Sequence, residues 1–201
     1  MVKLVEYNSL TLIFPKEEID YTGKEIEPLW AYKKFNVKKD SLVAFIGKME
    51  VDRNNMKDLA DLKREKLKIP IKSERAMNFV VEHFDTNNIK VAYLRQRLLI
   101  LIAKEVIESF GIKLRRDGDD LYINNKKLSV SIASSGITSH KIHLGINISS
   151  KGAEHVDIIG LGEYLDYNKI KEVMENIAYK YAEEIDKIEK DIRKTLPLIS
   201  L

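Results

Sequence analysis

An acidic turn followed by a lysine is the arrangement in this chain best suited to chemistry. In the stretch RRDGDDLYINNKKLSVSIAS, residues 115–134, Asp120 and Lys127 lie on either side of a predicted strand at 121–123 and a turn at 124–126. Because a hairpin brings its strands together, we expect Lys127 to fold back and pair with the Asp120 carboxylate. A lysine held this way can neutralise charge that develops on a phosphate or acyl-phosphate oxygen. The alternative is a cross-strand salt bridge on a solvated edge, contributing about 0–1 kcal/mol, and spacing alone favours it.

Two arginines precede this turn. Arg115 and Arg116 alternate across their predicted strand, so one of them can face any given site. An arginine that lines a cleft suits a carboxylate or a phosphate, and a rim arginine is the favoured alternative.

Two further pairs have the residue types of metal ligands. Asp58 and Asp61 lie three residues apart on a predicted helix and could hold Mg²⁺ with a nucleotide, although a charged surface turn is the favoured interpretation. His140 and His143 lie three apart on a predicted strand and so point to opposite faces, which argues against a shared metal. His143 could line a ligand site. A structural role, in which its ring makes a cross-strand hydrogen bond, is an equally good interpretation.

Hydrophobic periodicity gives the elements that must position these residues. Strands and helices follow one another with hairpins between them, which is typical of an α+β fold. The predicted strands cover 2–6, 10–14, 42–51, 77–84, 112–116, 121–123, 127–133 and 141–148, and the last four form one antiparallel sheet. The predicted helices cover about 25–35, 53–66, 92–110 and 168–195. Leu94, Leu98, Ile102, Val106 and Phe110 mark the apolar stripe of the third helix, and Gly111 stands where a left-handed C-cap belongs.

Composition limits the class of protein. The 201 residues are 44% hydrophobic and 32% charged, which is typical of one globular domain covering residues 1–201. The net charge of +3 does not favour nucleic acid as a partner. The absence of cysteine excludes disulfides, thiolate metal sites and a cysteine nucleophile.

Location is inferred from segments that the sequence lacks. No apolar stretch is long enough to span a membrane, and the first residues do not have the pattern of a signal peptide, so we expect a cytoplasmic protein. Abundant Lys, Glu and Ile with a single glutamine, Gln96, are typical of thermophiles.

The opening stretch resembles the central motif of the biotin protein ligases. That motif is Lys-Trp-Pro-Asn-Asp-Leu-Tyr, followed by a hairpin, a Lys-Leu-Ala-Gly step and an aliphatic strand. In this register Arg116 stands at the motif's lysine, Asp119 at its asparagine and Asp120 at its aspartate. Lys127 stands at the lysine that contacts the acyl group and the adenylate phosphate in that family.

Other segments extend the resemblance in the same order along the chain. HLGINI, residues 143–148, resembles a Gly-Ile-Gly-Ile-Asn-Val strand of the ligases, with Asn147 at its asparagine. IDYTG, residues 19–23, is similar to an Asp-Ser-Thr-Asn entry to the first helix, in which Thr22 matches while Tyr21 and Gly23 depart. The chain is still more similar to an archaeal domain family of unknown function grouped with the biotin/lipoate protein ligases. The resemblance implies an α+β fold with a mixed, mainly antiparallel sheet flanked by helices.

Two departures bear on activity. The ligases wrap the adenylate phosphates in a Gly-Arg-rich loop, whereas residues 51–66 contain no glycine, although Arg53 could still supply charge. The small Ala-Gly pair after the lysine is replaced here by bulkier residues at 128–130.

The functional prediction is a ligase-like enzyme that binds a nucleotide-activated acyl compound or a carboxylate. Lys127 would stabilise the phosphate or acyl oxygen, Asp120 would position Lys127 or the attacking amine, and Arg116 would meet the anionic end. Asp119, Thr22, Asn147, His143 and Arg53 complete the predicted ligand site, with ATP and Mg²⁺ as candidate cofactors and no metal ligands assigned. The alternatives are a non-catalytic small-molecule-binding module on the same fold and, third, an RNA-binding protein. A membrane partner is not expected, and a homodimer would use the last helix or an edge strand.

Overall fold

Three long neighbouring strands form the centre of the molecule. The computed structural model describes residues 2–51, 53–59, 62–63, 71–153 and 156–198. The central strands are β3 (Ser41–Glu50), β4 (Lys72–His83) and β9 (His140–Asn147), which pair antiparallel. They carry apolar residues on both faces because both faces are covered.

Shorter strands complete a six-stranded sheet in the order β1-β2-β3-β4-β9-β8. These are β1 (Val2–Glu6), β2 (Thr11–Pro15) and β8 (Ser129–Ser135). All neighbours are antiparallel except β2 and β3, which run parallel. The predicted mixed, mainly antiparallel sheet is confirmed.

The opening stretch forms a separate small sheet, which differs from the single antiparallel sheet expected for its region. β5 (Arg115–Asp117), β6 (Asp120–Ile123) and β7 (Lys126–Lys127) pair in sequence order. Gly118, with φ 59°, provides the left-handed turn between β5 and β6. The chain leaves this sheet at Leu128 and joins the large one at Ser129.

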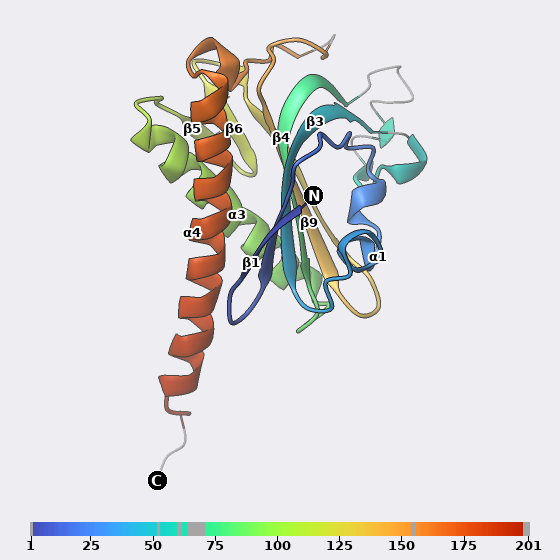
Figure 1. Ribbon diagram of the computed structural model, residues 1–201, viewed down its shortest axis with the longest axis vertical. Coiled ribbons are helices and arrows are strands. Elements are labelled where there is room, and N and C mark those ends of the chain that lie inside the picture. The colour runs from blue at the N-terminus through green and yellow to red at the C-terminus, as the bar shows by residue number, and fades with distance from the viewer. Residues whose placement is uncertain (1, 52, 60–61, 64–70, 154–155, 199–201) are drawn as a thin grey trace.

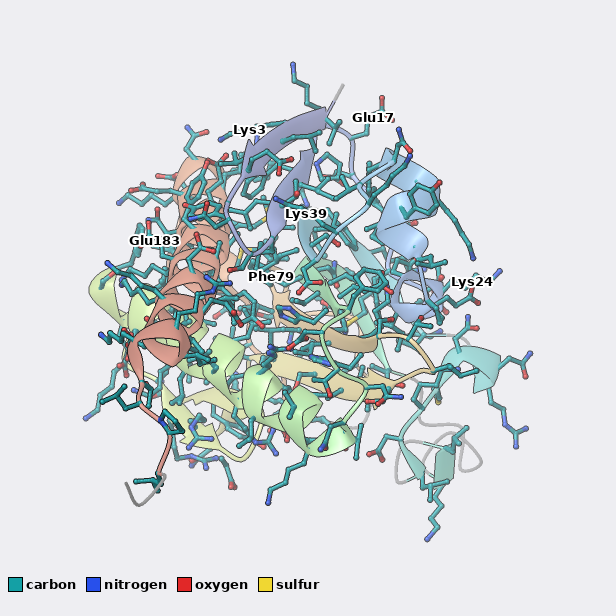
Figure 2. All side chains as sticks on the ribbon, turned by 90° about the horizontal axis from the view of Figure 1, so that it is seen from below. Lys3, Glu17, Lys24, Lys39, Phe79 and Glu183 are labelled. Carbon is teal, nitrogen blue, oxygen red and sulfur yellow. The ribbon has the colours of Figure 1, made fainter. Side chains whose placement is uncertain are left out.

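Helices cover both faces of the large sheet, in agreement with the predicted sheet flanked by helices. α3 (Ile89–Ser109) and α4 (Tyr167–Lys194) pack on one face, while the short α1 (Trp30–Phe35) lies across the other (Figure 1). One-turn 3₁₀ helices lie at Lys24–Ile26 (η1), Arg53–Asn55 (η2) and Leu161–Glu163 (η3). Seen from below, Lys24 lies on the side of the molecule opposite Glu183 of α4 (Figure 2).

The predicted apolar stripe of α3 is confirmed except at its first residue. Ile102 and Val106 are buried, and Leu98 and Phe110 are partly buried against the core, whereas Leu94 is 62% exposed. The buried face also carries Ala92, Gln96, Leu99, Ile100, Ala103 and Ile107. The helix is apolar around most of its circumference, so a repeat of four alone could not choose the buried face. Gly111, with φ 86°, has the left-handed backbone predicted for it.

Candidate functional site

The predicted ion pair of the opening stretch is present. Lys127 Nζ lies 2.8 Å from Asp120 Oδ2, and the two side chains are 22% and 25% exposed. Lys127 lies opposite Tyr122 in the small sheet, and the Tyr122 hydroxyl is 3.4 Å from the same Asp120 oxygen. The pair is therefore partly buried. Its exposure is intermediate between that of a solvated surface salt bridge and that of an enclosed ligand site.

Asp119 and Arg116, the two other residues of this turn that match the ligase motif, make different contacts. Asp119 turns toward α3, where it accepts hydrogen bonds from Gln96 Nε2 and Ser131 Oγ and lies 3.2 Å from Arg97. Arg116 is exposed and donates to the carbonyl of Gly118 in its own turn. These contacts fold the hairpin onto itself and onto α3.

The backbone of Lys127 is held by a neighbouring segment. Its N–H donates to the Asp157 carbonyl, and its own carbonyl accepts from the Ile159 N–H. Asn147, at the end of β9, also directs its side-chain amide to the Lys127 carbonyl, at 3.5 Å. Asn147 is 6% exposed and thus joins the large sheet to the small one.

His143 lies on the opposite face of β9 from His140, as predicted. Its ring stacks on Tyr21 with centroids 3.5 Å apart and planes 6° apart. Its Nε2 lies 3.0 Å from Asn78 Oδ1, which is the cross-strand hydrogen bond considered above. Complete burial lowers the His143 pKa to about 3, so the ring is neutral and Nε2–H donates.

Thr22 and Arg53 line a cleft of about 500 Å³ on the face that carries η1 and η2. The Thr22 N–H and hydroxyl bond to the Glu25 carboxylate, and its carbonyl accepts from the Asn55 side chain. These bonds tie the Thr22 turn to both 3₁₀ helices. The other polar residues of the cleft are Asp20, Lys24, Lys48, Glu50, Asn55 and Lys72.

Glu50 is the electrostatic centre of this cleft. Its carboxylate lies 2.5 Å from Lys48 Nζ and 2.7 Å from Lys72 Nζ. Hydrogen bonds from these two lysines lower the Glu50 pKa to about 2. Glu50 therefore stays ionised at all physiological pH values.

A smaller apolar hollow adjoins the cleft. It has a volume of about 30 Å³, which is room for a water molecule or two. His143, Asp58 and Ser131 line it together with apolar side chains from the sheet and the 51–56 segment. Tyr21, Val51, Asn55 and Met56 line both the hollow and the cleft.

The predicted site residues are therefore not all brought together, and His143 lines the hollow rather than the cleft. Asp120, Lys127 and Asn147 are linked through side chains and one carbonyl, while Asp119 and Arg116 make other contacts. Thr22 and Arg53 share the cleft, and neither Lys127 nor Asp120 lines it. Asp61, the proposed partner of Asp58, lies outside the described residues.

Sequence reasoning missed the lysines of the cleft. A signal was available, because Lys48 and Glu50 are two residues apart on one strand and so share a face. Lys72 begins the next long strand and pairs with Glu50 in the register of β3 and β4. A hairpin pairing of these two strands would have predicted the cluster.

One described group has metal-ligand geometry at the far end of the sheet. Ligand atoms of Asp40, His83 and Asp85 lie within 4.8 Å of one another. Each is already engaged: His83 Nδ1 lies 2.7 Å from Asp40, and Arg95 binds both oxygens of Asp85. This group is an internal polar network.

Comparison with known proteins identifies the family. Residues 10–196 match the model of a domain of unknown function, DUF366. The chain is 66% identical over 191 residues to the uncharacterized protein MJ0805 of Methanocaldococcus jannaschii, covering 94% of this chain and 86% of that one. The chain belongs to the DUF366 family.

Solved structures show what this family's fold is similar to. A protein of unknown function from Pyrococcus horikoshi superposes with a TM-score of 0.88 at 38% identity, covering 95% of this chain and 100% of that one. Ta0514 of T. acidophilum, a candidate lipoate protein ligase with bound lipoic acid, gives a TM-score of 0.55 at 11% identity over 87% and 85% of the two chains. A mutant biotin protein ligase of Aquifex aeolicus with biotin gives 0.55 at 20% identity over 89% and 71%.

These likenesses confirm the predicted fold. The DUF366 chain has the α+β architecture of the biotin and lipoate protein ligases. At these identities the likeness extends to the fold alone. Among the described residues, no helix is long and apolar enough to cross a membrane.

Proposed function

We propose that this DUF366 protein binds a small anionic molecule in the cleft beside Thr22 and Arg53. The observation that carries the proposal is the charge of the lining: Lys24, Lys48, Arg53 and Lys72 against Asp20 and Glu50. A concave surface with an excess of one charge concentrates the opposite charge. The volume of about 500 Å³ is in the range of small-molecule sites.

The donors of the cleft suit a carboxylate or a phosphate. Arg53 offers a planar fork of N–H groups, and the lysines offer compact charges. The segment 51–66 lacks glycine, so side chains would supply the contacts that a glycine-rich loop makes through its backbone. The bound lipoic acid of Ta0514 and the biotin of the Aquifex protein are both carboxylic acids, which supports an anionic ligand on this fold.

The proposal is tested by calorimetric titration with pyrophosphate and with ATP. We expect saturable binding that weakens as salt is added, because exposed charges are screened. Charge reversal at Lys24→Glu together with Arg53→Glu should weaken binding at least tenfold. Lys38→Glu makes the same kind of charge change outside the cleft and should leave binding unchanged. Absence of saturable binding, or equal weakening by Lys38→Glu, would refute the anion site.

A second candidate function is ligase-like acyl activation, which the Asp120–Lys127 pair favours. The pair is partly buried and stands in the register of the ligase motif. The expected chemistry is attack of a carboxylate on the α-phosphate of ATP, with release of pyrophosphate. The test measures pyrophosphate release with ATP and biotin, lipoate or octanoate. Release that Lys127→Ala abolishes would support this candidate, whereas no release with any of the three acids would exclude ligation of these substrates.

A further inference from the structure

Glu50 holds two of the four basic side chains that line the cleft. Its carboxylate lies 2.5 Å from Lys48 Nζ and 2.7 Å from Lys72 Nζ. Contacts this short between opposite charges are charge-assisted hydrogen bonds. Lys24 and Arg53 are the other two basic residues of the lining. Half of the cations that face the cleft are therefore balanced by a carboxylate that belongs to the chain itself.

The backbone of β3 brings these three side chains together. The register of β3 against β4 shifts on either side of Lys48. The Lys48 N–H donates to Asp20 Oδ1, and the Lys48 carbonyl accepts from the Tyr21 N–H. Irregularities of this kind re-aim side chains, and Lys48 lines the cleft. Two residues further on, Glu50 lies opposite Lys72 in the register, so one carboxylate meets both ammonium groups.

These ion pairs can exchange partners with a ligand. All three side chains are partly exposed, and exposed ion pairs are weak because water and salt screen them. An anion that enters the cleft can therefore take the two lysines from Glu50. The Glu50 carboxylate is fixed to the same strand as Lys48, so it competes as an intramolecular partner at a high effective concentration. The ligand gains only the difference between its own contacts and those of Glu50.

This competition favours ligands with several negative charges. A single carboxylate that displaced Glu50 would give the two lysines the same chemical group that they already hold. A diphosphate carries more charge and offers more acceptor oxygens, which the four basic side chains of the cleft can share. The balance at Lys48 and Lys72 therefore turns in favour of a compact polyanion.

We propose that Glu50 is an internal competitor that a ligand must displace from Lys48 and Lys72, so that the cleft takes compact polyanions such as diphosphates and not monocarboxylates. This inference rests on the proposed anion site, because it names the ligand class and the limit on affinity of that same cleft. Glu50 acts through the two lysines, and it is therefore a specificity-determining residue rather than a contact of the ligand.

The test compares the affinity for pyrophosphate of the original chain and of Glu50→Gln, by calorimetric titration at one ionic strength. Glu50→Gln keeps the size of the side chain and releases both lysines, so binding should tighten by about fivefold or more. Glu183→Gln makes the same change of charge on α4, on the side of the molecule opposite Lys24, and should leave the affinity unchanged (Figure 2). Acetate should show no saturable binding to the original chain.

Asp20→Asn is the matched variant within the cleft. It also removes a negative charge from the lining, but Asp20 accepts from the N–H of Lys48 rather than holding two ammonium groups. Displacement therefore predicts a smaller gain in pyrophosphate affinity for Asp20→Asn, about twofold at most. Equal gains for Asp20→Asn and Glu50→Gln would mean that Glu50 acts only through the charge of the cleft, and would overturn the displacement.

The two proposals fail in different ways. If the original chain binds pyrophosphate and Glu50→Gln binds it no more tightly, the role of Glu50 is overturned and the anion site stands. If Glu50→Gln binds pyrophosphate and the original chain does not, the anion site of the original chain is overturned while the blocking role of Glu50 stands. If neither chain binds it, both proposals are overturned. Acetate binding by the original chain as tight as that of pyrophosphate would overturn the selection of polyanions. Should Glu50→Gln fail to fold, Glu50→Ala also removes the carboxylate, and the same outcomes apply to it.

Discussion

The central strands β3, β4 and β9 share two ends that are built differently. At one end, where β3 begins, β4 ends and β9 begins, polar residues form a network around the buried His83, with Asp85 at its exposed edge. His83 lies 2.7 Å from Asp40 and 3.0 Å from the Tyr181 hydroxyl, and it is 1% exposed. Arg95 holds the Asp85 carboxylate and lies 3.2 Å from His140. Hydrogen bonding by Arg95 lowers the Asp85 pKa.

A buried ion pair completes this network end. Lys141 Nζ lies 2.7 Å from Glu82 Oε2, and the side chains are 3% and 2% exposed. The other Glu82 oxygen accepts from the Leu29 N–H and the Ser139 hydroxyl. Leu29 has a left-handed backbone at φ 64°, so Glu82 also holds the strained turn that begins α1.

The other end of these strands, the cleft end, carries Lys48, Glu50 and Lys72. Its charges are similar to those of the network end, but they are more exposed than the buried Lys141–Glu82 pair. These three side chains are 52%, 42% and 35% exposed. They line the cleft of about 500 Å³. Charges whose partners are buried within the chain contribute to the fold, whereas these half-exposed charges, although paired with one another, can still be reached from the cleft. The contrast supports the proposed site at the cleft end.

The largest expected difference between the two ends is in the free energy of unfolding that is lost when Glu82 or Glu50 is removed from its ion pair. Glu82→Ala leaves Lys141 buried without its partner and should lower the free energy of unfolding by about 3–5 kcal/mol. Glu50→Ala removes an exposed partner and should cost about 1 kcal/mol or less. Urea unfolding monitored by circular dichroism measures both. Similar losses for the two variants would contradict the distinction between the ends.

We expect low pH to lower the stability of the fold through His143. Its pKa of about 3 lies below the ordinary value of 6.5, so the native ring stays neutral while the unfolded chain takes up a proton below pH 6.5. Stability contributed by the neutral ring is therefore present above pH 6.5 and is lost as the pH falls toward 3. At about 1.4 kcal/mol per pH unit, the loss between pH 6.5 and pH 5 is about 2 kcal/mol.

His143→Gln is the matched variant for this prediction. Glutamine keeps an N–H donor for Asn78 and does not titrate. The free energy of unfolding, measured in urea at pH 6.5 and pH 5, should fall more steeply in the original chain than in the variant. Parallel slopes would mean that His143 does not carry the effect.

The same substitution, tyrosine to phenylalanine, can be made at two buried tyrosines to compare the two ends. Tyr181→Phe removes the hydroxyl that meets His83 and should cost about 1 kcal/mol, because a buried partner loses its hydrogen bond. Tyr21→Phe keeps the ring that stacks on His143 and should therefore cost less than Tyr181→Phe. Thermal unfolding of the two variants checks this, and an equal loss would argue against a stabilising hydrogen bond between Tyr181 and His83.

The fold was largely predictable from the sequence because its signals are local. Alternating strands, the Asp117–Gly118 turn and the long amphipathic helix over 167–194 are patterns within short segments. The Lys127–Asp120 pair was also local, since a hairpin fixes it. The separate small sheet was not foreseen, because the crossing from β7 to β8 at Leu128 depends on contacts with the 157–159 segment.

The cleft was harder to predict than the hairpin. Thr22, Arg53 and Lys72 lie far apart in the sequence and meet only through the pairing of β3 with β4 and the return of Tyr21 to β3. The resemblance supplied Thr22 as a site residue, and it also located Arg53, which lies in the segment that corresponds to the phosphate loop of the ligases. No periodic pattern predicts that Tyr21 stacks on His143 across the sheet face.

The central claim is that ligand binding belongs to the cleft rather than to the hairpin pair. Its most direct test is the affinity for pyrophosphate of three chains: the original, Arg53→Ala and Lys127→Ala. We predict that Arg53→Ala weakens binding at least tenfold and that Lys127→Ala leaves the affinity unchanged. The opposite result, with binding lost in Lys127→Ala and kept in Arg53→Ala, would place the site at the Asp120–Lys127 pair and contradict this account.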